Sequence, residues 1–199
     1  MKLHQRVLTA SLAVFSLGLT AAPQVGAPAP DFTVVDSKGN SHSLKDFAGK
    51  NLILEWTNHD CPFVQKHYQG NMQALQAQMT AQDMVWLSVI SSAPGKQGHV
   101  SGAKADELTA SRSAVPTAVV FDEAGTMGKA YDAKTTPHMY VIDKAGVLQY
   151  MGGIDSIPSA KVEDIANATP YFANAATAVA QAEKPDPAIT RPYGCSIKY

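Results

Sequence analysis

Residues 52–64 read LILEWTNHDCPFV. The first five residues form an apolar run interrupted only by Glu55, which is the pattern of a strand buried on both faces. A proline fits in the first turn of a helix, so Cys61 and Pro62 mark the point where a helix begins. The segment therefore predicts a central buried strand that passes through a short polar loop into a helix.

Strands and helices alternate on both sides of this segment. The patterns predict strands at 32–35, 84–90, 117–121, 138–142 and 147–151, helices or helical turns at 43–47, 61–81, 103–114 and 169–183, and a short helix or loop at 123–131. This order resembles a thioredoxin-like fold, an α/β fold with a central mixed sheet flanked by helices. Periodicity alone leaves several α/β topologies open.

The composition excludes several classes of protein. The chain has 199 residues, which suits one domain, and a net charge of -1, which shows no basic surface for nucleic acid. It has two cysteines, Cys61 and Cys195, too few for a disulfide-rich scaffold or a four-cysteine zinc site. It also lacks a nucleotide-binding glycine pattern, and we expect neither a cofactor nor a metal.

The N-terminus has the pattern of a secretory signal. Residues 1–21 combine a basic start, at Lys2 and Arg6, with an apolar run that ends at the small residue Ala21. The run is shorter than the roughly 20 apolar residues of a membrane span. We therefore expect a signal peptide at 1–21, a domain at 22–183 and a C-terminal tail at 184–199 that carries Cys195. The mature protein would be periplasmic or secreted, where disulfides persist, with no stable membrane insertion.

The start of a helix favours a reactive cysteine. Backbone N–H groups and the positive end of the helix dipole stabilise a thiolate over a thiol, which lowers the pKa of Cys61 from about 8.5. The thiolate is the nucleophilic form. Asp60 would oppose this effect if its carboxylate were close. The alternative is a buried structural cysteine, although the residues before it, at 58–60, are polar and should be near solvent.

Four segments together resemble the redoxin superfamily, which includes the peroxiredoxins (the alkyl hydroperoxide reductase and thiol-specific antioxidant family) and exported thioredoxin-like proteins. They are VGAPAPDF at 25–32, EWTNHDCP at 55–62, TPHMYVIDKAG at 136–146 and RPYGCSIKY at 191–199. The last resembles the Gly-Cys-Ser ending of a peroxiredoxin-like subgroup with a Cys-Pro-Phe-Val site.

The resemblance implies roles for individual residues. Cys61 takes the place of the attacking cysteine, and Pro137 takes the place of a cis-proline that faces it. Glu55 corresponds to a buried acid that exchanges protons with a leaving thiolate, the alternative being a structural carboxylate. Substrate-binding positions are then Thr136, Pro137, Asn58 and His138, where Asn58 can donate a hydrogen bond and His138 can tune the thiolate.

The sequence also departs from these families. Val64 stands where thioredoxins have a second cysteine, so a C-x-x-C dithiol is excluded. The peroxiredoxin signature places Thr or Ser at position 58 and Pro at position 54, whereas Asn58 and Leu54 stand here. No arginine lies in the cis-proline segment, which leaves Arg112 and Arg191 as candidates.

We therefore expect an exported thiol-based oxidoreductase in which Cys61 is the nucleophile and Cys195 the resolving thiol. Its partners would be a thiol, disulfide or hydroperoxide and an external thiol electron donor. A permanent Cys61–Cys195 disulfide that pins the tail is the structural alternative. A peroxide reductase is a second reading of the function. A copper or other metal carrier that uses His59, His67 and His138 beside Cys61 is a third.

Overall fold

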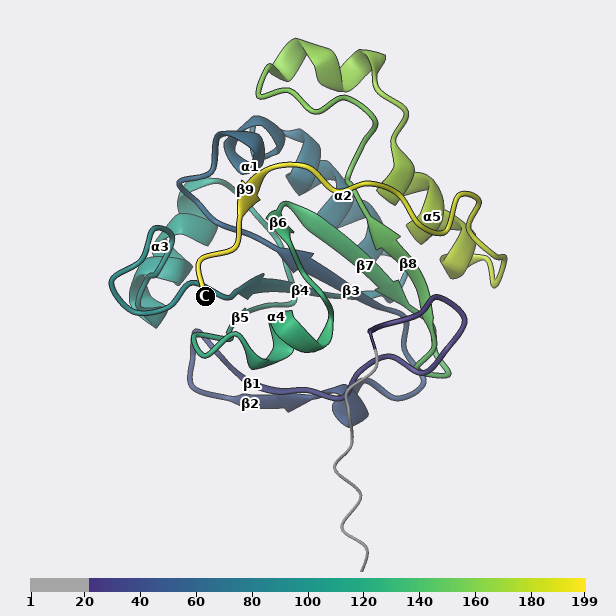
Figure 1. The fold of residues 1–199 in the computed structure, drawn as a ribbon, viewed down its shortest axis with the longest axis horizontal. Coiled ribbons are helices and arrows are strands. Elements are labelled where there is room, and N and C mark those ends of the chain that lie inside the picture. Colours follow the sequence, from purple (N-terminus) through teal and green to yellow (C-terminus); the bar gives the residue numbers. More distant parts are fainter. Residues whose placement is uncertain (1–21) are drawn as a thin grey trace, which may run out of the picture.

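A computed structural model describes residues 22–199, and the signal peptide predicted at 1–21 lies outside them (Figure 1). The strands are β1 (Thr33–Asp36), β2 (Ser41–Ser43), β3 (Leu52–Trp56), β4 (Val85–Ile90), β5 (Ala118–Phe121), β6 (Thr135–Thr136), β7 (His138–Ile142), β8 (Leu148–Gly152) and β9 (Cys195–Ser196). Seven of them form one mixed sheet in the order β2-β1-β5-β4-β3-β7-β8. The parallel trio β3, β4 and β5 lies at its centre, which confirms the predicted α/β architecture with a mixed sheet.

Helices cover both faces of this sheet. They are α1 (Pro62–His67), α2 (Asn71–Thr80), α3 (Gly102–Ser111), α4 (Thr126–Ala130) and α5 (Tyr171–Ala180), with 3-10 helices η1 (Leu44–Phe47) and η2 (Val162–Asn167). Apolar residues of α2 and α5 pack against Ile53, Trp86 and Met139 on one face. The opposite face packs Leu54 and Trp56 against α4 and the N-terminal segment. Strand β3 is buried throughout because its alternating side chains enter both cores.

The helix predicted over 61–81 is wrong as a single element. It divides into α1 and α2, because Gly70 lies between them with φ +115°, a conformation that ends one helix and starts the next in a new direction. The apolar spacing continues across this break, so periodicity alone did not reveal it.

The C-terminal tail contains a strand that the sequence did not predict. Strand β9 pairs with β6 in antiparallel register, with Cys195 opposite Thr136. Two residues are too few for an alternating pattern, and the partner strand comes from a remote part of the chain. In Figure 1 the tail crosses one face of the molecule from α5 to β9 and ends beyond it.

Glycines in the body of the domain make room for this tail. A side chain at Gly152 would meet Thr190, and a side chain at Gly128 would meet the ring of Tyr199. Backbone hydrogen bonds join Thr190 to Met151 and Ile197 to Lys134. The tail is therefore packed into the domain on both sides of Cys195.

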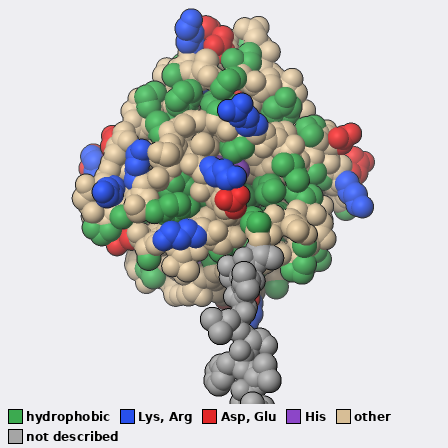
Figure 2. Space-filling model, in the orientation of Figure 1, with side chains coloured by type: hydrophobic (Ala, Val, Ile, Leu, Met, Phe, Trp, Pro, Cys, Tyr) green, Lys and Arg blue, Asp and Glu red, His purple; other side chains and the backbone are tan. Residues whose placement is uncertain are grey.

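On the face that the tail crosses, charged side chains are scattered among hydrophobic and uncharged ones (Figure 2). No helix within residues 22–199 has the length and apolar character needed to cross a membrane.

Candidate active site

Cys61 lies at the junction of the sheet and the first helix. It is the N-cap of α1, directly followed by Pro62 in the first turn, and its side chain is fully buried. The Cys61 thiol donates a hydrogen bond to the carbonyl oxygen of Thr136, 3.1 Å away. The peptide bond from Thr136 to Pro137 is cis, as the resemblance implied, so Cys61 faces the cis-proline segment.

Cys195 and Cys61 both contact Thr136. Pairing of β9 with β6 places Cys195 opposite Thr136, whose carbonyl also accepts from Cys61. The two thiols lie within hydrogen-bonding reach of each other, and both are free. Cys61 is fully buried, whereas Cys195 is partly exposed. The fold thus joins two cysteines that are 134 positions apart in the sequence.

The two thiols have opposite pKa shifts. Burial opposes ionisation of Cys61, but hydrogen bonds from the Cys195 thiol and from backbone N–H groups of Val64 and Cys195 outweigh it, so the pKa of Cys61 is lowered. Burial and the neighbouring Cys61 raise the pKa of Cys195 to about 11. Cys61 is therefore the first of the pair to ionise, with Cys195 as its hydrogen-bond donor. Neither Asp60 nor an arginine is among the main causes of the Cys61 shift.

This difference gives a testable titration. The thiolate absorbance of the reduced protein should rise in two steps, one below the ordinary cysteine value near 9 and one near 11. In Cys195→Ala the upper step should disappear, and the lower step should move to higher pH because Cys61 loses its donor. A lower step that stays in place in the variant would contradict the hydrogen bond between the thiols.

Glu55 is fully buried on the face of β3 that α2 covers. Its carboxyl accepts hydrogen bonds from four side chains: Tyr68 at 2.8 Å, Trp86 and Ser88 at 2.9 Å each, and Gln76 at 3.4 Å. Burial raises the pKa of Glu55 despite these donors. Within the described chain, Cys61 is not one of its hydrogen-bond partners.

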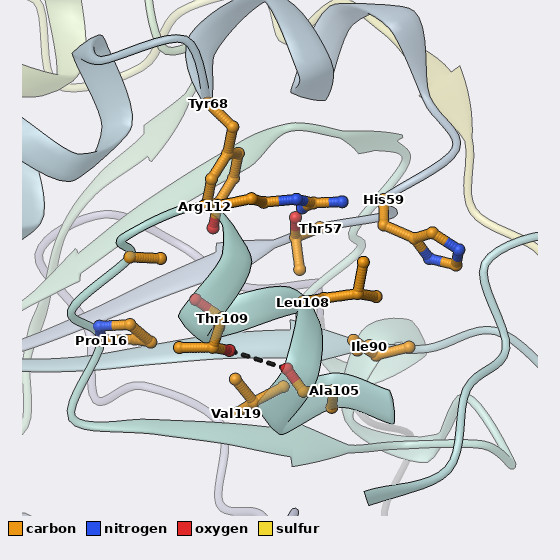
Figure 3. A pocket seen from close by; sticks show the side chains of 12 residues that line it. Thr57, His59, Tyr68, Ile90, Ala105, Leu108, Thr109, Arg112, Pro116 and Val119 are labelled. Carbon is orange, nitrogen blue, oxygen red and sulfur yellow. Dashed lines mark hydrogen bonds between the residues drawn. The ribbon is translucent and has the colours of Figure 1, made fainter. Parts of the chain in front are cut away.

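A small cavity of about 40 Å³ lies beside the Glu55 network (Figure 3). Tyr68 and Ser88, which bond Glu55, line it together with Thr57 and Arg112. The hydroxyl of Thr57 is buried without a hydrogen-bond partner, and the guanidinium of Arg112 lies 5.0 Å from the ring centre of Tyr68. A cavity of this size can hold a water molecule, and the Thr57 hydroxyl offers it a polar partner. Arg112 thus belongs to this cavity.

The predicted substrate-binding residues divide into two groups. Thr136 and Pro137 lie at the two thiols, and the hydroxyl of Thr136 is buried without a hydrogen-bond partner. Asn58 braces the loop before Cys61, because its side chain accepts from the Asp60 N–H and donates to the Gln97 carbonyl. His138 is buried, and its Nδ1 accepts from the Lys134 N–H.

The histidines considered as metal ligands have other partners. His67 is hydrogen-bonded to Asn71 and Tyr193, and His59 lies 3.2 Å from the Asp60 carboxylate. Burial lowers the pKa of His138 to about 3. Among residues 22–199, no group of three or more His, Cys, Asp or Glu side chains is arranged to hold a metal ion. The structure therefore gives no support to the metal-carrier alternative.

Sequence reasoning missed a buried charged cluster next to the site. Lys66, His67 and Asp155 are almost fully buried and surround the hydroxyl of Tyr193. No periodic pattern marks these residues. Lys and Asp are rarely buried in proteins, and the sequence alone does not reveal that Lys66 and Asp155 are.

Comparison with solved structures shows the same fold in other proteins. A protein described as hypothetical, from Sinorhizobium meliloti, has a TM-score of 0.73 at 19% identity, over 90% of this chain and 96% of that one. An uncharacterized conserved protein from Geobacillus kaustophilus has a TM-score of 0.72 at 22% identity, over 88% and 92%. A thiol:disulfide interchange protein from a Bacteroides species has a TM-score of 0.51 at 20% identity, over 63% and 79%.

Comparison at the sequence level identifies the family. No curated protein matches the chain significantly. The model of the AhpC/TSA family matches residues 25–151, which include Cys61 and Pro137 and stop before the tail with Cys195. The neighbouring folds and this match agree with the thioredoxin-like fold expected from the order of elements. The chain therefore belongs to the AhpC/TSA family of redoxins and has a thioredoxin-like fold, and its family supports thiol-based redox chemistry.

Proposed function

We propose that the protein is an exported thiol–disulfide oxidoreductase in which Cys61 is the nucleophile and Cys195 the resolving thiol. The observation that carries the proposal is the meeting of the two thiols at Thr136, where Cys195 donates to a Cys61 of lowered pKa. A permanent structural disulfide would not need this asymmetry of the two thiols.

The reaction has two steps. The Cys61 thiolate attacks one sulfur of a substrate disulfide, the substrate S–S bond breaks, and the other half leaves as a thiolate. Cys195 then attacks the Cys61 sulfur, the Cys61–Cys195 disulfide forms, and the second half of the substrate leaves. The two cysteines supply the two electrons, and their protons pass to the departing thiolates. Formation of the mixed disulfide removes the Cys61 charge that raises the pKa of Cys195, so the first step prepares the second.

Regeneration requires an external thiol electron donor. With both thiols free, Cys61 is fully buried and Cys195 is partly exposed, so in the disulfide form we expect a donor thiolate to reach the Cys195 sulfur first. Cys61 is then the leaving group, and its lowered pKa favours departure. The mixed disulfide with the donor should therefore form at Cys195.

A stoichiometric assay tests the proposal. Reduced protein is mixed with one equivalent of a symmetric aromatic disulfide whose thiolate is coloured, and the released thiolate is counted. We expect two thiolates per protein and an intramolecular disulfide by mass, but one thiolate and a stable adduct for Cys195→Ser. A single thiolate from the wild-type protein would refute the resolving role of Cys195.

We infer that Glu55 supplies protons to the site, as its raised pKa and the adjoining cavity support. Glu55→Gln keeps a neutral side chain that can accept from Trp86 and Ser88 and donate to Tyr68. The variant should slow disulfide exchange about tenfold, below the usual range for a directly placed acid or base. An unchanged rate would leave Glu55 with a structural role alone.

Glu55→Gln should also change how the stability of the protein depends on pH. A raised pKa means that the folded protein holds the proton more tightly than the unfolded chain does. This stabilisation is complete below the unfolded value of 4.5 and is lost as the pH rises through the folded value. Glu55→Gln has no proton to lose. Its free energy of unfolding, measured by chemical denaturation, should therefore increase relative to that of wild type as the pH rises above 4.5.

A peroxide reductase is the second candidate, favoured by membership of the AhpC/TSA family and by the unpartnered Thr136 hydroxyl at the thiols. Cys61 would attack the peroxide O–O bond, forming a sulfenic acid and an alcohol or water, and Cys195 would displace water to form the disulfide. Loss of thiols with hydrogen peroxide no faster than in free cysteine would exclude this activity.

We also propose that residues 1–21 are removed as a signal peptide, leaving the domain at 22–183 and the tail at 184–199 in the periplasm or outside the cell. The oxidising surroundings would suit a two-cysteine cycle. Sequencing the N-terminus of the protein recovered from the periplasm or medium tests this point.

A further inference from the structure

Tyr193, two residues before Cys195, is the only residue of the tail in a buried charged cluster. We define the tail-anchoring cluster as Lys66, His67, Asp155 and Tyr193. Lys66 and His67 lie on α1, which Cys61 caps, and Asp155 follows β8. The exposed fractions of Lys66, His67 and Asp155 are 1%, 0% and 5%. The cluster thus joins the tail directly to the helix that carries the nucleophile.

Three hydrogen bonds of the cluster meet at the Tyr193 hydroxyl. It donates to Asp155 Oδ1 at 2.6 Å and lies 3.4 Å from Lys66 Nζ. Asn71 can only donate from its amide nitrogen to His67 Nδ1, so the His67 proton lies on Nε2, 3.2 Å from the Tyr193 oxygen. The hydroxyl therefore has one acceptor and two donors, a set that places its oxygen within narrow limits.

Such a cluster is a poor means of adding stability. Burying a lysine and a carboxylate costs desolvation that their attraction rarely exceeds, and apolar side chains of the same volume usually serve as well. What buried hydrogen-bonded charges do provide is a defined geometry. The Lys66 Nζ to Asp155 Oδ2 distance of 3.4 Å and the further contact to the Ile157 carbonyl hold the group together without the tail. The tail adds one residue to a site that already exists.

The tail needs an anchor at this point. Thr190 is bonded to Met151, and Cys195 is paired with Thr136, but within the described chain residues 191–194 form no backbone hydrogen bond to the body of the domain. The ring of Tyr193 packs edge-on against Phe63, with ring centres 5.7 Å apart. Phe63, Lys66 and His67 all belong to α1, so these contacts fix Tyr193 to the helix that Cys61 caps. The hydrogen bond to Asp155 fixes it to the segment after β8.

We propose that the tail-anchoring cluster sets the rate of the second step, with Tyr193 as a positioning residue that holds Cys195 against Cys61. A resolving thiol on a tail acts through its effective concentration at its target, which falls when the segment that carries it becomes mobile. The inference rests on the proposed resolving role of Cys195.

The test separates the two steps. Tyr193→Phe keeps the ring against Phe63 and removes only the hydroxyl. In the one-equivalent assay, release of the first thiolate should be no slower than in wild type, and release of the second should slow about tenfold. Mass spectrometry should show the Cys61 adduct accumulating between the two. Asp155→Asn, which leaves Lys66 without its partner, should slow the second release as well.

Tyr131→Phe is the matched control. Tyr131 is also buried and loses one hydrogen bond, 2.7 Å to the Pro30 carbonyl, but it is not part of the tail-anchoring cluster. Both releases should be unchanged in this variant. An unaltered second release in Tyr193→Phe would overturn the inference while leaving the proposed function intact. A wild-type protein that releases only one thiolate would instead refute the function itself.

Discussion

Cys61→Ser should abolish disulfide exchange, with a fall in rate of about a thousandfold or more. Serine has nearly the same shape and can donate to the Thr136 carbonyl as the thiol does, so the buried site should remain intact. Its hydroxyl is not ionised near neutral pH and is a far weaker nucleophile toward a disulfide sulfur. The measurement is release of the coloured thiolate from an aromatic disulfide.

Cys195→Ser is the control for this result. It keeps Cys61 and should release the first thiolate at a rate similar to wild type, because a serine hydroxyl can take over the hydrogen bond to the thiolate. If Cys61→Ser releases its single thiolate as fast as wild type releases the first, the nucleophile has been misassigned. If Cys61→Ser and Cys195→Ser each release one at similar rates, the two thiols react independently and form no nucleophile–resolving pair.

Gly194→Ala should separate β9 from β6. Gly194 has φ +138°, which disfavours any side chain, and an added Cβ would meet the Thr136 carbonyl oxygen. This oxygen accepts the hydrogen bond from the Cys61 thiol. Thr136 is also the residue that pairs with Cys195 between β6 and β9. The tail therefore cannot keep its position. We expect release of the second thiolate to slow about a hundredfold, more than in Tyr193→Phe, since the pairing itself is lost.

Gly39→Ala is the matched control for backbone strain. Gly39 also has a positive φ, +87°, but an added Cβ would meet nothing within 4 Å. Both variants should lose about 1–2 kcal/mol of stability from the unfavourable φ. Only Gly194→Ala should also slow the second release and raise the pKa of Cys61, which loses its donor. Equal behaviour of the two variants would show that the tail tolerates displacement without effect on the thiols.

The central strand, the helix start at Cys61 and the alternation of elements could be predicted from the sequence, because these features depend on local patterns. A continuous apolar run such as that of β3 is typical of a strand whose two faces are both covered, and β3 is buried throughout. The end of α1 could not be predicted, because Gly70 interrupts a helix whose apolar spacing continues beyond it. Strand β9 was missed because its two residues become a strand only through their partner, β6.

The sequence by itself predicted which atom is reactive: the sulfur of a cysteine at a strand-to-helix junction, with proline after it and no second cysteine three residues on. Only the tertiary structure decided that Cys195 lies at that atom, that its thiol is the donor and Cys61 the first to ionise, and that Tyr193 is held by Lys66, His67 and Asp155. The reason is physical. Helix starts and buried strands arise from interactions between near neighbours in the chain, whereas pairing across 134 positions depends on contacts that have no local pattern.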